Sequence, residues 1–456
     1  MVTKPSDMFT SDAELSATLV SNAIDFNELR KSRYDKLSRY YDGDHDILYD
    51  NSYSDKFSMV INHAQGITDF YVGYLLGNEV EYQERQGSEG LLDRVLEEYR
   101  EQEIGTLDVE LGEDLSIFGR AYELIYLDGN NVRSAVIDPR SAVCVYDTSV
   151  KHNKRFAVIY EIEKDPVNRE KIVKATVYDE VNQYEYNNGV LGEGVPHNFE
   201  QIPVVEYHNN KRCTGDFECV VGLIDGYNIL QSIRVSDKEQ LMDAILVAYG
   251  MDLDNTDVEQ LKKYKTLSRV PSDARLEYLV KALNEADTDV LRQVIEDDIH
   301  KISKVPNLTD RAFGGNISGV ALAYKQLGFQ QNVNKKEKYM KKGFNERCTI
   351  YGSYQLMGTD IKAEMIDIVF KHGLPKNDLE ISSMINNLRG QVSQETLISQ
   401  LSFVNDASEE IEAIESKQDN QNFGTEEALD GIDRGLEDNV TKKKESILQK
   451  LGNIFQ

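Results

Sequence analysis

Two groups of residues in this sequence are of types that bind metal ions, and each departs from the spacing that binding requires. The stretch Asp42-Gly-Asp-His-Asp46 begins like a calcium-binding loop. Such a loop needs glycine at its sixth position and glutamate at its twelfth, whereas this chain has Ile47 and Tyr53 there. We therefore expect a solvated turn in which Asp44 or His45 makes a local hydrogen bond.

The second group consists of His208, Cys213 and Cys219. Their spacing matches no common zinc motif and no fourth ligand is evident, so we expect two ordinary thiols and a surface histidine. Acid–base catalysis would instead call for paired carboxylates. Because the chain has 79 acidic residues, such pairs arise by chance and indicate no catalytic site.

The common sequence patterns of enzymes and cofactor sites are absent. None of G-x-x-x-x-G-K-S/T, G-x-G-x-x-G, H-E-x-x-H or G-x-S-x-G occurs, which removes the usual phosphate, dinucleotide, zinc and hydrolase signatures. The cysteines, which are Cys144, Cys213, Cys219 and Cys348, form no C-x-x-C pair and are typical of a reducing compartment. We expect no catalytic residue, no metal and no cofactor.

The formal net charge of −28 argues against a conventional DNA-binding regulator. Such proteins bind phosphates through lysine and arginine, which displace counterions. A surface along which DNA slides without being held is consistent with the acidic balance. So is a protein that never meets DNA.

Two basic clusters stand out against this acidic background. One contains Lys262, Lys263, Lys265 and Arg269, and the other contains Lys335, Lys336, Lys338, Lys341 and Lys342. Each is either a solvated face or a place of contact with an acidic neighbour.

The length of 456 residues suggests about three domains of roughly 150 residues each. No apolar run is long enough to span a bilayer, and the first residues lack the apolar core of a secretory signal. A capping-box pattern at Ser11 to Glu14 predicts a helix that ends at Tyr40-Tyr41. Further helices are expected at about 58–76 and 91–117, the latter interrupted near Gly105.

From Ala121 the hydrophobic period changes to two, which predicts an antiparallel β-rich unit up to about residue 208. A long helix is then expected at 217–249, followed by a compact segment at 250–287. The helix at 288–305 is amphipathic and is ended by Pro306. Its apolar face has Val290, Leu291, Val294, Ile295, Ile299 and Ile302, and its polar face has Gln293, Glu296, Asp297 and His300.

A glycine-containing loop at 307–317 separates this helix from the next one. Ser318 is expected to cap a long helix over 319–357, with Gly328 as a kink site. After Gly373-Leu-Pro375 a small helical unit follows at about 376–417. The acidic composition of residues 404–439 predicts a disordered tail.

Several short motifs follow one another in a characteristic order between about residues 35 and 415. They are Tyr40–Ile47, Tyr74–Gly77, Leu115–Glu123, Ile202–Asn210, Gly215-Asp216, Leu223–Asn228, Val305-Pro306, Ser318–Ala321 and Gln394–Thr396. In this order they resemble the portal proteins of long-tailed double-stranded-DNA phages, especially the subfamily common in phages of Gram-positive hosts.

The resemblance implies an α+β portal fold, mainly helical, with the chain divided into named parts. Residues 1–216 and 318–374 would form the wing, 217–249 and 288–306 the two stem helices, and 250–287 a small α/β clip. Residues 307–317 would be the tunnel loop, 375–420 a helical crown and 421–456 an acidic tail. The tunnel loop would place Asn307, Asp310, Arg311, Phe313, Gly314, Gly315 and Asn316 at the DNA channel.

The resemblance also implies a homo-dodecameric ring at one capsid vertex, present in the virion and assembled in the host cytoplasm. Its partners would be the terminase large subunit, the head–tail connector, the major capsid and scaffolding proteins, and DNA passing through. In this arrangement Lys262, Lys263, Lys265 and Arg269 of the clip would contact a partner, and Gln293, Glu296, Asp297 and His300 would face the channel. The alternatives are a virion scaffold or adaptor without a channel, and a minor virion nuclease or protease.

Overall fold

The computed structural model describes most of the chain. It covers residues 8–50, 57–85, 90, 92–164, 171–242, 245–252, 254–264, 271, 273–279, 285–307, 319–354, 361–372, 378–398, 401, 404, 410–411 and 413–414. The chain divides into two compact units, Met1–Gly373 and Leu374–Gln456. Helices and sheets both occur in quantity, which confirms the predicted α+β class. No described helix is long and apolar enough to cross a membrane.

Helix α1 (Ala17–Tyr41) begins later than the sequence predicted. Its cap is Ser16, whose hydroxyl accepts a hydrogen bond from the Leu19 backbone N–H at 3.3 Å. The predicted cap, Ser11, instead accepts from the Ala13 N–H within a turn. The prediction was wrong because a serine followed by a glutamate satisfies a turn as readily as a helix start.

Helices α2 (His63–Leu76), α3 (Asp93–Glu101) and α4 (Ile104–Phe118) complete the helical part before the sheets. The predicted interruption exists, and it falls at Glu103, whose φ of 52° is left-handed. Helices α2 and α4 pack closely, since a Cβ added at Gly112 would lie 2.4 Å from Leu76. Gly119, with a φ of +81°, ends α4 and lets the chain turn directly into a strand.

The β-rich unit contains two antiparallel sheets, with one short parallel addition. The larger sheet has the order β1-β5-β6-β7-β8-β10, with β9 paired to β8 and β1 parallel to β5. The smaller sheet has the order β11-β3-β4. The strands are β1 (Phe9–Thr10), β3 (Arg120–Asp128), β4 (Asn131–Ile137), β5 (Ala142–Tyr146), β6 (Lys154–Lys164), β7 (Lys171–Tyr178), β8 (Asn182–Asn187), β9 (Val190–Leu191), β10 (Val195–Pro196) and β11 (Val204–His208).

The two faces of the β-rich unit supply two separate cores. One face packs on α1 through residues such as Leu19, Val20, Val143 and Phe156. The other face joins the two sheets through Tyr122, Cys144, Ala157, Ile202 and Val204. Alternate residues of each strand therefore belong to different cores, as the period of two requires.

The predicted helix over 217–249 is shorter in the structure. A 3-10 turn η3 (Glu218–Val220) leads into α5 (Val221–Met242), and residues 245–249 form strand β12 (Ile245–Tyr249). This strand pairs antiparallel with β13 (Arg275–Leu279). The predicted helix was too long because the β-branched and aromatic residues of β12 pair with a strand that is distant in sequence, which local periodicity cannot reveal. Helix α6 (Asn255–Tyr264) lies between the two strands in sequence.

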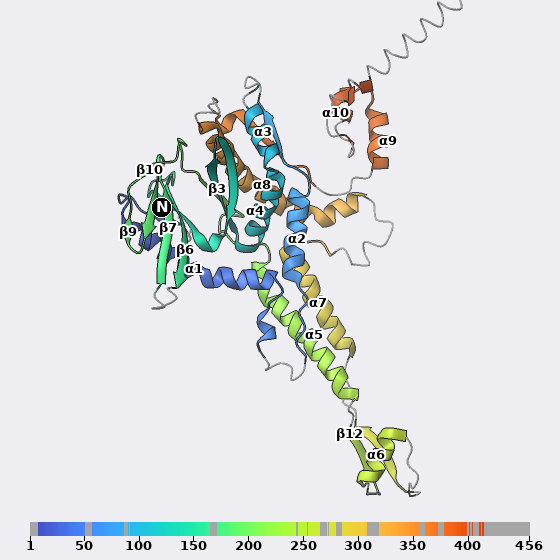
Figure 1. Ribbon diagram of the computed structural model, residues 1–456. Coiled ribbons are helices and arrows are strands. Elements are labelled where there is room, and N and C mark those ends of the chain that lie inside the picture. The colour runs from blue at the N-terminus through green and yellow to red at the C-terminus, as the bar shows by residue number, and fades with distance from the viewer. Residues whose placement is uncertain are drawn as a thin grey trace, which may run out of the picture. The chain divides into compact units, whose positions relative to one another are not determined.

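Helix α7 (Glu285–Ser303) returns beside α5, as Figure 1 shows. Helix α8 (Gly319–Ser353) is continuous through Gly328, the predicted kink site. Strand β14 (Ile366–Val369) pairs with β2 (Glu81–Glu84). Short 3-10 turns are η1 (Asp46–Leu48), η2 (Pro139–Ser141) and η5 (Ala363–Met365). The second unit contains α9 (Asp378–Leu388) and α10 (Gln394–Ile398). Residues 415–456, which include most of the acidic stretch 404–439 and all of the predicted tail at 421–456, lie outside the described residues.

A buried arginine joins α8 to the rest of the first unit. Arg347 is fully buried, and its guanidinium lies 2.6 Å from Asp108 on α4 and 3.6 Å from Glu123 on β3. It also donates a hydrogen bond to the Tyr82 hydroxyl on β2. Burial raises the pKa of Asp108 to about 6, and the neighbouring guanidinium opposes that rise.

Substitution of Arg347 by methionine should strongly destabilise the first unit. Loss of the guanidinium leaves Asp108 and Glu123 buried without their cation, which costs about 3 kcal/mol or more. The measurement is urea unfolding followed by circular dichroism.

The matched control for this variant is Arg85→Met. Arg85 lies 2.7 Å from Asp367, but both side chains are more than half exposed, so the unfolding midpoint should stay at the wild-type value. An Arg347→Met midpoint equal to that of the control would show that the buried cation does not hold α8 in place.

Candidate functional site

Helices α5 and α7 form a pair, and one carboxylate of α7 makes ion pairs with arginines of both helices. Asp289 of α7 lies 3.0 Å from Arg292 one turn later and 3.7 Å from Arg234 of α5. Arg292 also lies 2.6 Å from Glu296. The carboxylate of Asp289 therefore meets arginines of both helices.

The first half of α5 is fixed by buried polar side chains. The Asn228 side-chain oxygen accepts from the Ile61 N–H at 2.9 Å, and the Ser232 hydroxyl accepts from the Met59 N–H at 2.9 Å. Both side chains are fully buried. The segment before α2 is thus hydrogen-bonded to α5 through side chains whose loss would leave two half-buried backbone donors without these partners.

The Asp42–Asp46 turn belongs to the same junction. His45 is buried and lies 3.0 Å from the Tyr40 carbonyl through Nε2 and 3.1 Å from the Asn228 amide through Nδ1. The Asp44 carboxylate accepts from the Tyr49 hydroxyl at 2.6 Å. The predicted local hydrogen bond of Asp44 or His45 is confirmed at both residues, but the turn is not fully solvated as predicted, because the His45 ring is buried.

The end of α7 is held by α2. The Tyr71 hydroxyl donates to the Ser303 carbonyl at 2.8 Å. The His63 ring lies 4.9 Å from the Tyr227 ring and 6.2 Å from the His300 ring. Burial lowers the pKa of His63 below its usual range, and His300 adds to that effect.

The apolar face of α7 is only partly used within the chain. Ile299 is fully buried, but Val290 is 60% exposed and Leu291 and Val294 are 49% exposed. Ile302 of α7 and Ile233 of α5 are also exposed. We call the residues Val290, Leu291, Val294 and Ile302 the α7 stripe. A stripe of large apolar side chains left in solvent marks an interaction surface.

The four polar residues expected to face a channel have different surroundings. Gln293 and Asp297 are exposed. Glu296 is ion-paired with Arg292, and the half-buried His300 lies 3.1 Å from the Val305 carbonyl. Gln293 also donates a hydrogen bond to the Asp289 carboxylate at 3.1 Å. Three of the four side chains are therefore bonded to groups of the same chain, and two of the four are exposed.

The other predicted site residues fall largely outside the described residues. Asn307 is half-buried, whereas Asp310, Arg311, Phe313, Gly314, Gly315 and Asn316 belong to the undescribed stretch 308–318. Lys263 lies exposed on α6. Lys265, Arg269 and the side chain of Lys262 are not among the described groups.

The second basic cluster is not a uniform surface. Lys335, Lys338 and Lys342 are exposed, but Lys336 is 3% exposed and lies 2.6 Å from Asp216. The sequence carried a signal for this, because Lys336 shares a helix face with Val333, Met340 and Phe344, all of them buried. Lys336 is therefore a structural cation on the buried face of α8.

His208, Cys213 and Cys219, which were considered as zinc ligands and expected to be ordinary side chains, do not form a metal site. His208 lies 3.2 Å from Glu206, Cys213 is buried and Cys219 is exposed. Among the described residues, no group of three His, Cys, Asp or Glu side chains is arranged to hold a metal ion.

A family model described as phage portal protein, SPP1 Gp6-like, matches residues 21–423, most of this chain. The chain belongs to this portal protein family. A portal protein of Clostridium phage phiCD119 is 21% identical over 294 residues, which are 60% of this chain and 64% of that relative. The match thus spans less than two thirds of the relative's length.

Membership of the portal family agrees with the sequence in two respects. Portal proteins are structural components of the phage particle and not enzymes, as the missing catalytic motifs indicated. The relative comes from a phage of a Clostridium host, which fits the resemblance to portals of phages that infect Gram-positive bacteria.

The junction around His63 should make this portal protein sensitive to acid. Folding lowers the pKa of His63 below the unfolded value of 6.5. Its contribution to the free energy of unfolding is therefore complete above pH 6.5 and declines as the pH falls below that value. Between about pH 7.5 and 5.5, the melting temperature of the wild type should therefore fall further than that of His63→Phe.

The measurement is differential scanning fluorimetry across that pH range. His152→Phe, on a loop away from the helix pair, serves as control and should keep the wild-type pH dependence. Equal falls for the wild type and His63→Phe would remove His63 as the source of the acid sensitivity.

Proposed function

We propose that this protein forms a homo-dodecameric ring at one capsid vertex, through which double-stranded DNA enters and leaves the phage head. The observation that carries this proposal is the exposed α7 stripe. Val290, Leu291 and Val294 project three large apolar side chains into solvent from one helix. Burial against a neighbouring subunit would remove their apolar area from water.

A ring follows if the stripe packs on a different surface of the next subunit. Such a heterologous contact repeats from subunit to subunit and closes when the rotation between them divides a full turn. The exposed Ile233 of α5 is a suitable apolar neighbour across such a contact. The buried junction of Asn228 and Ser232 with the segment before α2 would give every subunit the same helix direction.

The acidic balance suits a channel for DNA. Helix α7 carries six acidic residues, Glu285, Asp287, Asp289, Glu296, Asp297 and Asp298, and the bases Arg292 and Lys301. Exposed carboxylates repel the phosphate backbone, so DNA passing such a wall is not held. We propose that the exposed Gln293 and Asp297 face this channel, with Glu296 and His300 beside them.

The remaining parts are proposed from the family resemblance, with helix limits taken from the structure. Residues before 217 and 318–374 form the wing, α5 and α7 the stem, and β12, α6 and β13 the clip. Residues 307–317 form the tunnel loop and 375–420 the crown. The clip, with Lys262, Lys263, Lys265 and Arg269, would contact the terminase large subunit and later the head–tail connector, while capsid and scaffolding proteins would surround the wing.

Introduction of a carboxylate into the α7 stripe should block ring assembly. Val294→Glu places a charge where the next subunit would pack, and an unpaired buried charge is costly. We expect assembly to require at least about tenfold more protein, which corresponds to about 1.4 kcal/mol. Mass photometry across a concentration series measures this, and negative-stain images would show fewer rings with a central hole.

Val190→Glu is the matched control, because Val190 is 68% exposed at the edge of the β-rich unit and lies away from the helix pair. It should assemble like the wild type. Wild-type assembly by Val294→Glu would rule out the stripe as the subunit contact. A wild type that never forms a ring would favour a scaffold or adaptor without a channel.

Removal of Asp310 to Gly315 should impair DNA packaging while rings still form. This segment lies between Pro306 and the start of α8, and the resemblance assigns it to the narrowest part of the channel. Procapsids that carry the deletion should contain little DNA by nuclease-protection assay. A normal amount of packaged DNA in the deletion variant would contradict the tunnel-loop role. Failure to form rings would instead indicate that the segment belongs to the contact between subunits.

A further inference from the structure

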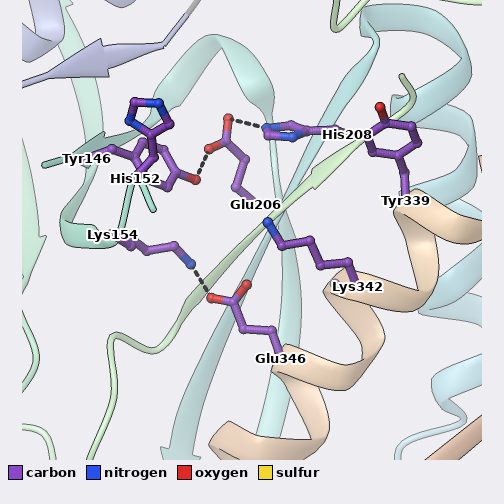
Figure 2. Close-up of a pocket in the computed structure, with 9 residues that line it drawn as sticks. Tyr146, His152, Lys154, Glu206, His208, Tyr339, Lys342 and Glu346 are labelled. Carbon is purple, nitrogen blue, oxygen red and sulfur yellow. Dashed lines mark hydrogen bonds and ion pairs between the residues drawn. The ribbon is translucent and has the colours of Figure 1, made fainter. Parts of the chain in front are cut away.

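A small pocket lies between the β-rich unit and α8, away from the α5–α7 pair. Its volume is about 190 Å³, and its lining includes Lys154 of β6, Glu206 and His208 of β11, and Lys342 and Glu346 of α8. Figure 2 shows these side chains converging from the strands on one side and from the helix on the other. All five lie in the part assigned above to the wing, and none belongs to the α7 stripe, the clip or the tunnel loop.

The pocket exists because α8 approaches β11 very closely at one glycine. A Cβ added at Gly343 would lie 2.2 Å from the Tyr207 ring, so only glycine permits this spacing. The side chains one residue before and three residues after it, Lys342 and Glu346, are thereby brought to the edge of the strands. The pocket is therefore formed by the packing of α8 against β11.

The carboxylates of the pocket already have cationic or hydroxyl partners. Glu206 is ion-paired with the buried Arg120 and accepts hydrogen bonds from the hydroxyls of Tyr122 and Tyr146. The pKa of Glu206 is held well below its usual range, since its cationic partners outweigh the effect of burial. Glu346 lies 2.5 Å from Lys154. These two acids are therefore each neutralised by a separate buried or half-buried cation.

Lys342 has no such partner. It is exposed, and the structure places no carboxylate of a described residue within ion-pair distance of its amino group. In Figure 2 that amino group extends from α8 toward the strand that carries Glu206. Arg120, which lies outside the pocket lining, is matched with Glu206, and Lys154 is matched with Glu346. The amino group of Lys342 is therefore the positive charge in excess over these ion pairs.

We propose that this pocket binds a small oxyanion, a phosphate or a carboxylate, with the amino group of Lys342 as its principal ligand. Tyr339 and His152 also line the pocket. An oxyanion complements the excess charge, and charge-assisted hydrogen bonds to it are strong. The ligand could be a free anion such as inorganic phosphate, or an acidic side chain of a neighbouring protein chain.

The test uses the full-length protein and two lysine variants on the same helix. Lys342→Met removes the proposed ligand, while Lys338→Met removes an exposed lysine that does not line the pocket. Inorganic phosphate is titrated by isothermal calorimetry at constant ionic strength. The salt dependence of assembly is measured in parallel by mass photometry.

A free anion is the ligand if phosphate binds the wild type and Lys338→Met equally but binds Lys342→Met about tenfold more weakly or not at all. In that case the three proteins should also assemble at the same concentration. An acidic side chain is the ligand if Lys342→Met alone shifts the assembly midpoint and phosphate inhibits wild-type assembly. The proposal is overturned if Lys342→Met matches Lys338→Met in both phosphate binding and assembly. Lys342→Arg, which keeps the charge, should behave like the wild type in either case.

Discussion

The buried cation of Arg347 is the constraint on which the arrangement of the first unit depends. A guanidinium taken out of water needs carboxylates around it, and here they come from α4 and β3, which are far from α8 in sequence. Eleven residues earlier in α8, Lys336 meets Asp216 in the same manner. Two buried ion pairs about 16 Å apart along one helix fix both its position and its rotation. No sliding of α8 by a turn could satisfy both.

The second of these ion pairs also connects α8 to the helix pair. Asp216 stands just before η3 and α5, and it also accepts from Ser116 at the end of α4. Tyr71 of α2 has the Lys336 amino group over its ring, at 5.2 Å, and donates to the end of α7. The start of α5 and the end of α7 are therefore both connected to one polar cluster. This cluster gives the α7 stripe the same direction on every subunit.

The sequence was sufficient to predict most of the helices and the β-rich unit, but not the strands β2 and β14, and it predicted much less of the side-chain arrangement. Alternation identified the β-rich unit and helical spacing identified α7, because both depend on neighbours in sequence. Residues 245–249 were assigned to a helix because their strand partner lies about 30 residues away. Lys336 and Arg347 were missed for a related reason: a charged side chain on an apolar helix face is buried only if its partner, here on α4, β3 or the segment before α5, comes to meet it.

The pairing of β2 with β14 has a consequence for synthesis on the ribosome. Residues 81–84 find their partners at 366–369, about 280 residues later in the chain. At about 5–20 residues per second, that delay lasts roughly 15–60 s. During it, α5 and α7 have already emerged, whereas neither the last strand nor the arginine of α8 is available. The nascent subunit therefore exposes its apolar helices well before its own fold can be completed, and that interval is when unassembled chains are most open to aggregation and to binding by chaperones.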